Sequence, residues 1–118
     1  MQSAATNQAM QECIKECTNC HTICEYTAAY CLQLGGPHAA PEHQRILRDC
    51  AQICHVSADF MLRGSPLHAA VCGVCAQVCV QCAESCERIG GGDAQMKACA
   101  DLCRRCAESC RQMAQARV

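Results

Sequence analysis

The chain has 118 residues and a formal net charge of −1, with acidic and basic residues mixed along it. This length suits one domain covering residues 1–118, and the balanced charge predicts neither a nucleic-acid-binding surface nor a membrane-binding patch. Sixteen residues are cysteine and only 3% are aromatic, so bulky apolar side chains are too few to fill a conventional core by themselves.

The beginning of the chain carries no recognisable export signal. Residues 1–7 lack the basic stretch and the apolar stretch that such a signal needs, and no run of about 18 apolar residues occurs in the sequence. We therefore expect a cytoplasmic protein without a membrane-spanning segment.

Glycine and proline divide the chain into four predicted helices. Breaks containing these residues lie at 34–41, 63–66 and 90–93, and such residues end one helix and start the next. The predicted helices cover about 7–34, 41–63, 66–89 and 93–116. Ser65 and Asp93 are candidate N-caps of the last two. Because the connections are short, neighbouring helices should be antiparallel, which predicts an all-α, up-down-up-down four-helix bundle.

The first predicted helix carries cysteines with gaps of four, three and four residues. They are Cys13, Cys17, Cys20 and Cys24, and Cys31 follows seven residues later. Residues three and four apart share one face of a helix. The thiols therefore form a stripe where a helix normally places its apolar seam, which predicts a cysteine-lined core.

The second predicted helix is the poorest in cysteine, with only Cys50 and Cys54 on its stripe. At helical spacing, the same stripe continues through His43, Leu47, Ser57 and Met61. We expect Leu47 and Ser57 to lie beside the row of thiols contributed by the other helices.

The third and fourth predicted helices repeat the C-x3-C-x2-C-x3-C pattern of the first. Their cysteines are Cys75, Cys79, Cys82 and Cys86, then Cys99, Cys103, Cys106 and Cys110. Both helices contain Cys-Ala-Glu-Ser-Cys, and Cys72 extends the third stripe by three residues. The two helices therefore form an internal repeat.

Reduced thiols in such stripes are ligands for soft metals: Cu(I), zinc or iron–sulfur clusters. Disulfide-rich domains place cysteines in loops, and the predicted loops here contain none. Zinc needs a closed set of four ligands and an iron–sulfur cluster a compact one, whereas these stripes are about 35 Å long. Cu(I) accepts two or three thiolates, and its single charge offsets that of a buried thiolate. Multiple Cu(I) ions are therefore favoured, with a zinc or iron–sulfur protein as the alternative.

A thiol redox protein is a further alternative, because four C-x-x-C pairs occur. They are Cys17/Cys20, Cys72/Cys75, Cys79/Cys82 and Cys103/Cys106. Such an enzyme needs an exposed thiol of low pKa and usually a βαβ pattern. The chain shows neither these features nor another catalytic constellation, so we predict that it is not an enzyme.

Methionine and histidine residues mark the two ends of the predicted bundle. One end should hold Met10, Met61, His68 and Met113, which we interpret as an entrance for Cu(I) with exchangeable ligands. The opposite end should hold His43 and Met96 as further candidate ligands. His21 and His55 each follow a stripe cysteine by one residue and are expected at the surface or at an interface, and His38 is expected to be exposed in a loop.

The three C-x3-C-x2-C-x3-C helices, with the Met and His residues at their ends, resemble the bacterial copper storage proteins over essentially the whole chain. The resemblance implies a cytosolic protein that binds multiple Cu(I) ions, protects against copper toxicity and supplies copper to copper enzymes, with these enzymes or copper chaperones as partners. It also implies a homotetramer. We expect its interface on the apolar residues that lie off the cysteine stripe, which are Ile46, Ile53, Phe60, Val71, Val74 and Val78. The cysteine-poor helix at 41–63 departs from the pattern and leaves the number of ions open.

Overall fold

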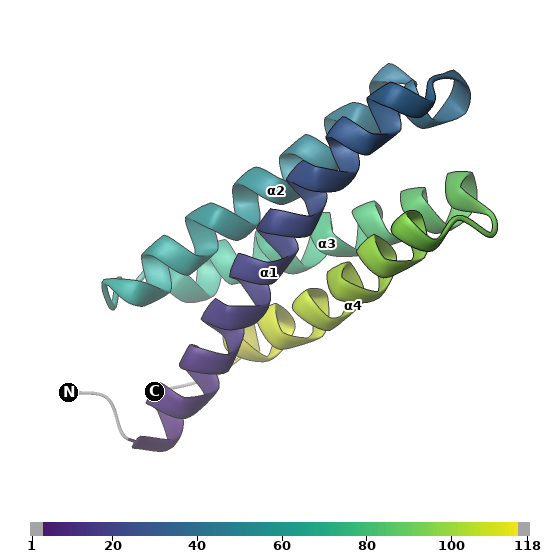
Figure 1. The fold of residues 1–118 in the computed structure, drawn as a ribbon. Helices are drawn as coiled ribbons and strands as arrows, with labels where there is room; N and C mark the ends of the chain where they lie inside the picture. Colours follow the sequence, from purple (N-terminus) through teal and green to yellow (C-terminus); the bar gives the residue numbers. More distant parts are fainter. Residues whose placement is uncertain (1–3, 116–118) are drawn as a thin grey trace.

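The computed structural model describes residues 4–115, which fold into four α-helices and one 3-10 turn (Figure 1). The elements are α1 (Ala4–Leu34), η1 (Gly36–Ala39), α2 (Pro41–Leu62), α3 (His68–Gly90) and α4 (Ala94–Gln115). No strand occurs within residues 4–115. The predicted all-α fold is confirmed.

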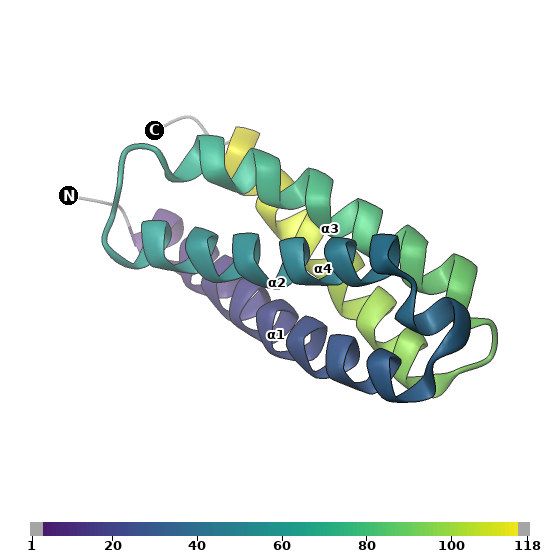
Figure 2. The ribbon, with the colours of Figure 1, turned by 90° about the horizontal axis from the view of Figure 1, so that it is seen from above.

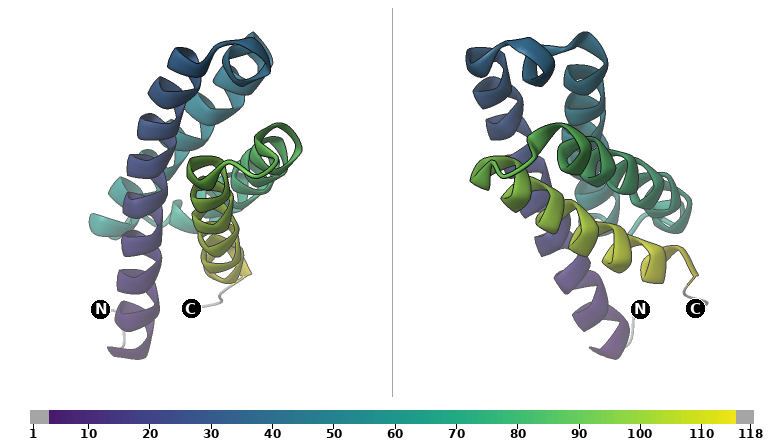
Figure 3. Two further views of the ribbon diagram at one scale, coloured as in Figure 1. Left: turned by 45° about the vertical axis from the view of Figure 1, so that its right-hand side comes forward. Right: turned by 90° about the vertical axis from the view of Figure 1, so that its right-hand side faces the viewer.

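The helices form an elongated antiparallel bundle of about 50 × 20 × 18 Å. Each helix packs against two neighbours, in the pairs α1–α2, α2–α3, α3–α4 and α1–α4. The diagonal pairs meet through side chains at the axis, as where Cys24 Sγ of α1 lies 3.8 Å from Cys82 Sγ of α3. Figure 2 shows the alternating directions of the helices, and Figure 3 shows α1 and α2 on one side with α3 and α4 on the other. The predicted up-down-up-down topology is confirmed, and the axis of the bundle lies between four inward-facing stripes.

Two helix starts differ from their predicted positions. The first helix begins at Ala4 rather than near residue 7, because alanine strongly favours helix. The third begins at His68 rather than at residue 66. Ser65 does not cap this helix: its Oγ accepts a hydrogen bond from Leu67 N–H at 3.1 Å within a tight turn that includes Pro66. The predicted end of the fourth helix at residue 116 lies outside the described residues.

Asp93 caps α4 as predicted and also joins α4 to α1. Its Oδ1 accepts a hydrogen bond from Met96 N–H at 2.9 Å, and its Oδ2 accepts one from the Tyr30 hydroxyl at 2.6 Å. The same carboxylate therefore satisfies a free backbone donor at the helix start and holds the end of α1 against the start of α4.

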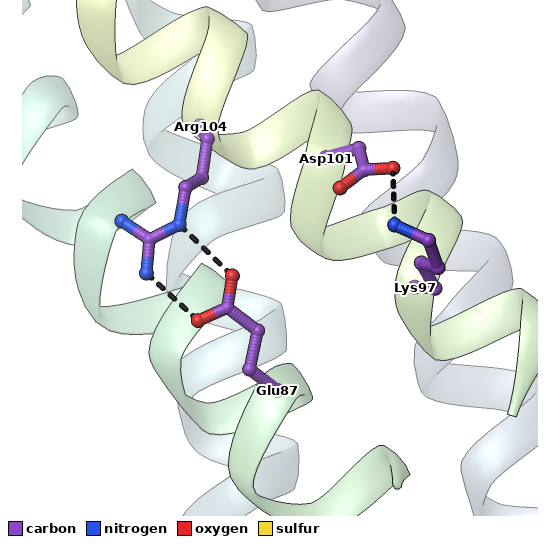
Figure 4. A network of polar contacts seen from close by, with 4 residues as sticks. All are labelled: Glu87, Lys97, Asp101 and Arg104. Carbon is purple, nitrogen blue, oxygen red and sulfur yellow. Dashed lines mark hydrogen bonds and ion pairs between the residues drawn. The ribbon is translucent and has the colours of Figure 1, made fainter. Parts of the chain in front are cut away.

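Charged side chains form ion pairs on the outside of the bundle. Arg104 donates from Nε and Nη2 to the two carboxylate oxygens of Glu87 at 2.9 and 2.8 Å, which ties α4 to α3 (Figure 4). Lys97 donates to Asp101 at 3.3 Å within α4. Exposed pairs of this kind add little stability, so the interior must hold the bundle together.

Among the described residues, α3 has a length and apolar composition compatible with crossing a membrane. Much of that apolar character comes from its five cysteines, Cys72, Cys75, Cys79, Cys82 and Cys86, which are buried against the other helices. Its composition therefore reflects a core helix of the bundle.

Candidate metal centre

All sixteen cysteines lie within the described residues and are buried, with side chains at most 1% exposed. None forms a disulfide. The stripes of the four helices thus face one another along the axis, as predicted, and they replace the leucine-rich seam of an ordinary bundle with thiols. Buried thiols pack as small apolar groups when they are neutral, which lets the metal-free chain keep a filled core.

Thiols from different helices touch along the whole row. Cys17 Sγ lies 3.4 Å from Cys110 Sγ, although the residues are 93 apart in sequence. Further along the row, Cys54 and Cys79 are 3.6 Å apart and Cys24 and Cys103 are 3.7 Å apart. These sulfur–sulfur distances are far longer than the roughly 2.05 Å of a disulfide bond. They match the spacing of about 3.8 Å between ligands that share one ion at metal–sulfur bonds of about 2.3 Å.

The thiols gather into overlapping sets of four whose sulfur atoms all lie within 4.8 Å of one another. In order along the axis, five of these sets are Cys17/Cys75/Cys106/Cys110, Cys54/Cys75/Cys79/Cys106, Cys20/Cys50/Cys54/Cys79, Cys20/Cys24/Cys50/Cys103 and Cys24/Cys82/Cys99/Cys103. Each set shares two thiols with the next. A thiolate in a shared pair can bridge two ions, so the sets form one continuous ladder rather than isolated sites.

Contacts between thiols shift their pKa values in opposite directions. The contact with Cys110 lowers the pKa of Cys13, whereas contacts with Cys106 and Cys13 raise the pKa of Cys110. Burial raises the pKa of Cys31 to about 11. No lysine or arginine is buried among the described residues, so a thiolate in this interior would lack a compensating charge, and the metal-free row is most stable as neutral thiols.

The end of the bundle beside η1 holds a mixed set of sulfur and nitrogen atoms. Cys31 Sγ lies 3.4 Å from Met96 Sδ and 3.6 Å from His43 Nε2. His43 is 1% exposed, and its Nδ1 lies 2.7 Å from Ser85 Oγ. Burial lowers the pKa of His43, which favours the neutral ring. If Nδ1 donates to Ser85, the lone pair on Nε2 faces Cys31, an arrangement typical of a metal-binding histidine.

His38 also belongs to this end, contrary to its expected place in an exposed loop. It lies in η1, half-buried, with Nδ1 3.9 Å from Cys31 Sγ. Sequence reasoning missed it because Gly36 and Pro37 marked a loop. The same two residues give η1 its tight turn, since Gly36 has a φ of 57°, and this turn carries His38 back toward the bundle.

At the end of the bundle predicted to be the Cu(I) entrance, only some of the candidate ligands lie against a thiol. Met10, Met61 and Met113 are buried there, and Met61 Sδ lies 3.8 Å from Cys72 Sγ. His68 does not join them in a thiol contact: its Nδ1 instead lies 2.9 Å from the Ser65 carbonyl oxygen. Across the described residues, the fuller mixed ligand set is therefore at the opposite end.

Two other histidines lie beside each other on the outer side of α1 and α2. The rings of His21 and His55 are 5.0 Å apart, and His21 Nδ1 lies 2.8 Å from Ala51 O. The surface position predicted for His55 is confirmed by its side-chain exposure of 61%, whereas His21 is half-buried. Neither ring contacts a thiol in the described part of the chain.

Comparison with known proteins gives consistent results over nearly the whole chain. Residues 6–115 match the sequence model of a family described as copper storage protein. The chain is 45% identical to a structurally characterised protein of Nitrosospira multiformis, with a TM-score of 0.86 over 92% of this chain and 96% of the other. It is 32% identical to the Cu(I)-bound copper storage protein BsCsp3, with a TM-score of 0.83 over 90% and 98% of the two chains. It is 28% identical to a cytosolic copper storage protein from Streptomyces lividans holding five coppers, with a TM-score of 0.85 over 98% and 100%.

Proposed function

This chain belongs to the copper storage protein family, and we propose that it stores many Cu(I) ions as thiolate complexes inside its four-helix bundle. The Cu(I)-bound and copper-loaded relatives that share its fold support copper as the metal. Storage of this kind removes free Cu(I), which is toxic, and keeps it for supply to copper enzymes. The function is sequestration, and we propose no catalytic reaction.

The overlap of the thiol sets is the observation that carries this proposal. Because neighbouring sets share pairs such as Cys75/Cys106 and Cys20/Cys50, one thiolate can serve two ions. A bridging thiolate and a Cu(I) ion together carry no net charge, so filling the row adds little charge to a buried interior. A closed zinc site with four thiolates of its own would leave two negative charges in the same place.

We propose all sixteen cysteines as ligands, with Cys31, His43 and Met96 forming a mixed site at one end. Met10, Met61 and Met113 are proposed as exchangeable ligands at the other end, where Met61 adjoins Cys72. His68 is a weaker candidate, because its Nδ1 already contacts a backbone carbonyl.

We also propose a cytoplasmic location and assembly as a homotetramer. An apolar groove between α2 and α3 supports the assembly: it is lined by Ile53, Val56, Val74 and Val78 beside polar residues. Val74 is 51% exposed, and burying such a side chain against another copy would be favourable. We propose the bundle as a single copper-binding domain, with copper enzymes or copper chaperones as partners in exchange.

An anaerobic titration of the reduced protein with Cu(I), in competition with a chromophoric Cu(I) chelator, tests the storage function. We expect saturation between about 8 ions per chain, if each ion takes two thiolates of its own, and about 16, if thiolates bridge. A parallel zinc titration is the control. Saturation at about one to four ions, or zinc binding that copper cannot displace, would contradict the proposal.

A further inference from the structure

We propose that the buried hydroxyl of Ser57 donates a hydrogen bond to a copper-bound thiolate and thereby strengthens Cu(I) binding at its level of the row. The inference rests on the proposed copper storage. It concerns a residue that contributes no ligand atom and acts only once the neighbouring thiols have bound copper.

Ser57 is fully buried, and its hydroxyl has no hydrogen-bond partner among the described residues. A serine inside a helix commonly bonds the backbone carbonyl four residues earlier, and Ser57 does not. An unpaired buried hydroxyl is unfavourable in the metal-free protein. The other buried hydroxyls differ, because Ser85 contacts His43 and Thr27 accepts from Gln95.

The contacts on either side of Ser57 define its position along the row. Three residues before it, Cys54 lies 3.7 Å from Cys75, and four residues after it, Met61 lies 3.8 Å from Cys72. Ser57 therefore lies at the level of α3 between Cys75 and Cys72, because α2 and α3 are antiparallel neighbours.

The set of thiols at this level lacks a member from α2. Cys17, Cys75, Cys106 and Cys110 come from α1, α3 and α4, and Ser57 occupies the position where the repeated pattern of the other helices places a cysteine. The side chain that α2 provides at this level is a hydroxyl.

Copper binding gives the Ser57 hydroxyl a stronger hydrogen-bond acceptor. A neutral thiol is a weak acceptor, but Cu(I) binding displaces the thiol proton to solvent and leaves a thiolate. A hydrogen bond to a charged acceptor is about twice as strong as one between neutral groups. The hydroxyl itself is a hard oxygen donor and a poor ligand for Cu(I). The Ser57 hydroxyl therefore acts by donating a hydrogen bond to a thiolate. Copper binding thereby removes the free-energy cost of the unpaired hydroxyl, which is present only in the metal-free state.

Ser57→Ala tests this role, because it removes the hydroxyl without adding a ligand. We expect the metal-free variant to melt a few degrees higher than the wild type, since the unpaired group is gone. In chelator competition, we expect a subset of its Cu(I) ions to be held about tenfold more weakly, since loading no longer pairs the hydroxyl.

Thr27→Val is the matched control, because it removes a buried hydroxyl that is already paired in the metal-free protein. It should lower the metal-free melting temperature and leave Cu(I) affinity unchanged. Competition curves that superimpose for the wild type and Ser57→Ala would overturn the inference, whatever the melting temperatures. Failure of the wild type to bind many ions in the same titration would instead contradict the proposed storage.

Discussion

Saturating the metal-free bundle with Cu(I) should release sixteen protons per chain, one for each cysteine. Every thiol is buried, and an uncompensated thiolate in a dry interior is unfavourable. The pKa of Cys31, raised to about 11 by burial, places that thiol firmly in its neutral form near pH 7. Each thiol must lose its proton to bind copper, so the count of protons equals the count of thiolates that become ligands.

Fewer protons would be released if the thiol–thiol contacts that lower pKa values outweighed the burial that raises them. Contacts with neighbouring thiols lower the pKa of six cysteines, which are Cys13, Cys20, Cys50, Cys75, Cys99 and Cys106. If these six were ionised before loading, only ten protons would be released. Six buried negative charges without cations would each cost several kcal/mol, so we expect sixteen.

Proton release also sets how the affinity depends on pH. The thiols are protonated in the metal-free state, so each proton displaced per ion makes binding about tenfold tighter per pH unit. This dependence should persist through neutral pH and weaken only as pH approaches the raised pKa of groups such as Cys31, about 11.

The protons can be counted with a pH indicator in weakly buffered, anaerobic solution while Cu(I) is added as its acetonitrile complex. Cys86→Ser is the matched control and should lower the count by one. A release of about ten protons by the saturated wild type would refute the claim that burial keeps the metal-free row neutral.

Three further predictions concern the bundle ends, the packing of α3 and the proposed assembly. His43→Ala should lower the copper content by about one ion per chain, measured by elemental analysis after desalting, and an unchanged content would exclude a ligand role. Gly90→Ala should destabilise the metal-free protein by about 1–3 kcal/mol in denaturant unfolding, because the new Cβ would lie 2.5 Å from Met96 Cβ. Gly73→Ala is the control and should show no such loss of stability, because its Cβ would lie 3.7 Å from its nearest neighbour. Val74→Glu should reduce the mass seen in sedimentation from four chains to one while the copper capacity persists, and a tetramer that survives would argue against an interface on this face.

The bundle could be predicted because its signals are local. Glycine and proline mark the helix breaks, and the spacing of residues such as Cys13 and Cys17 defines one face of a helix whatever the rest of the chain does. The predictions from sequence were wrong where the contacts of a few residues in or beside a turn determine the local structure. Ser65 bonds the backbone of its own turn rather than capping α3, and His38 lies against Cys31 although its neighbours mark a loop.

The periodic cysteines by themselves determined that thiols would line the core of a four-helix bundle, because helical periodicity depends only on residues three and four apart. Only the tertiary structure decided which thiols meet. The 3.4 Å contact of Cys17 with Cys110 and the unpaired hydroxyl of Ser57 both depend on how helices far apart in sequence are positioned along the bundle axis. These positions are set by the packing of all four helices together, and no local sequence pattern encodes that packing.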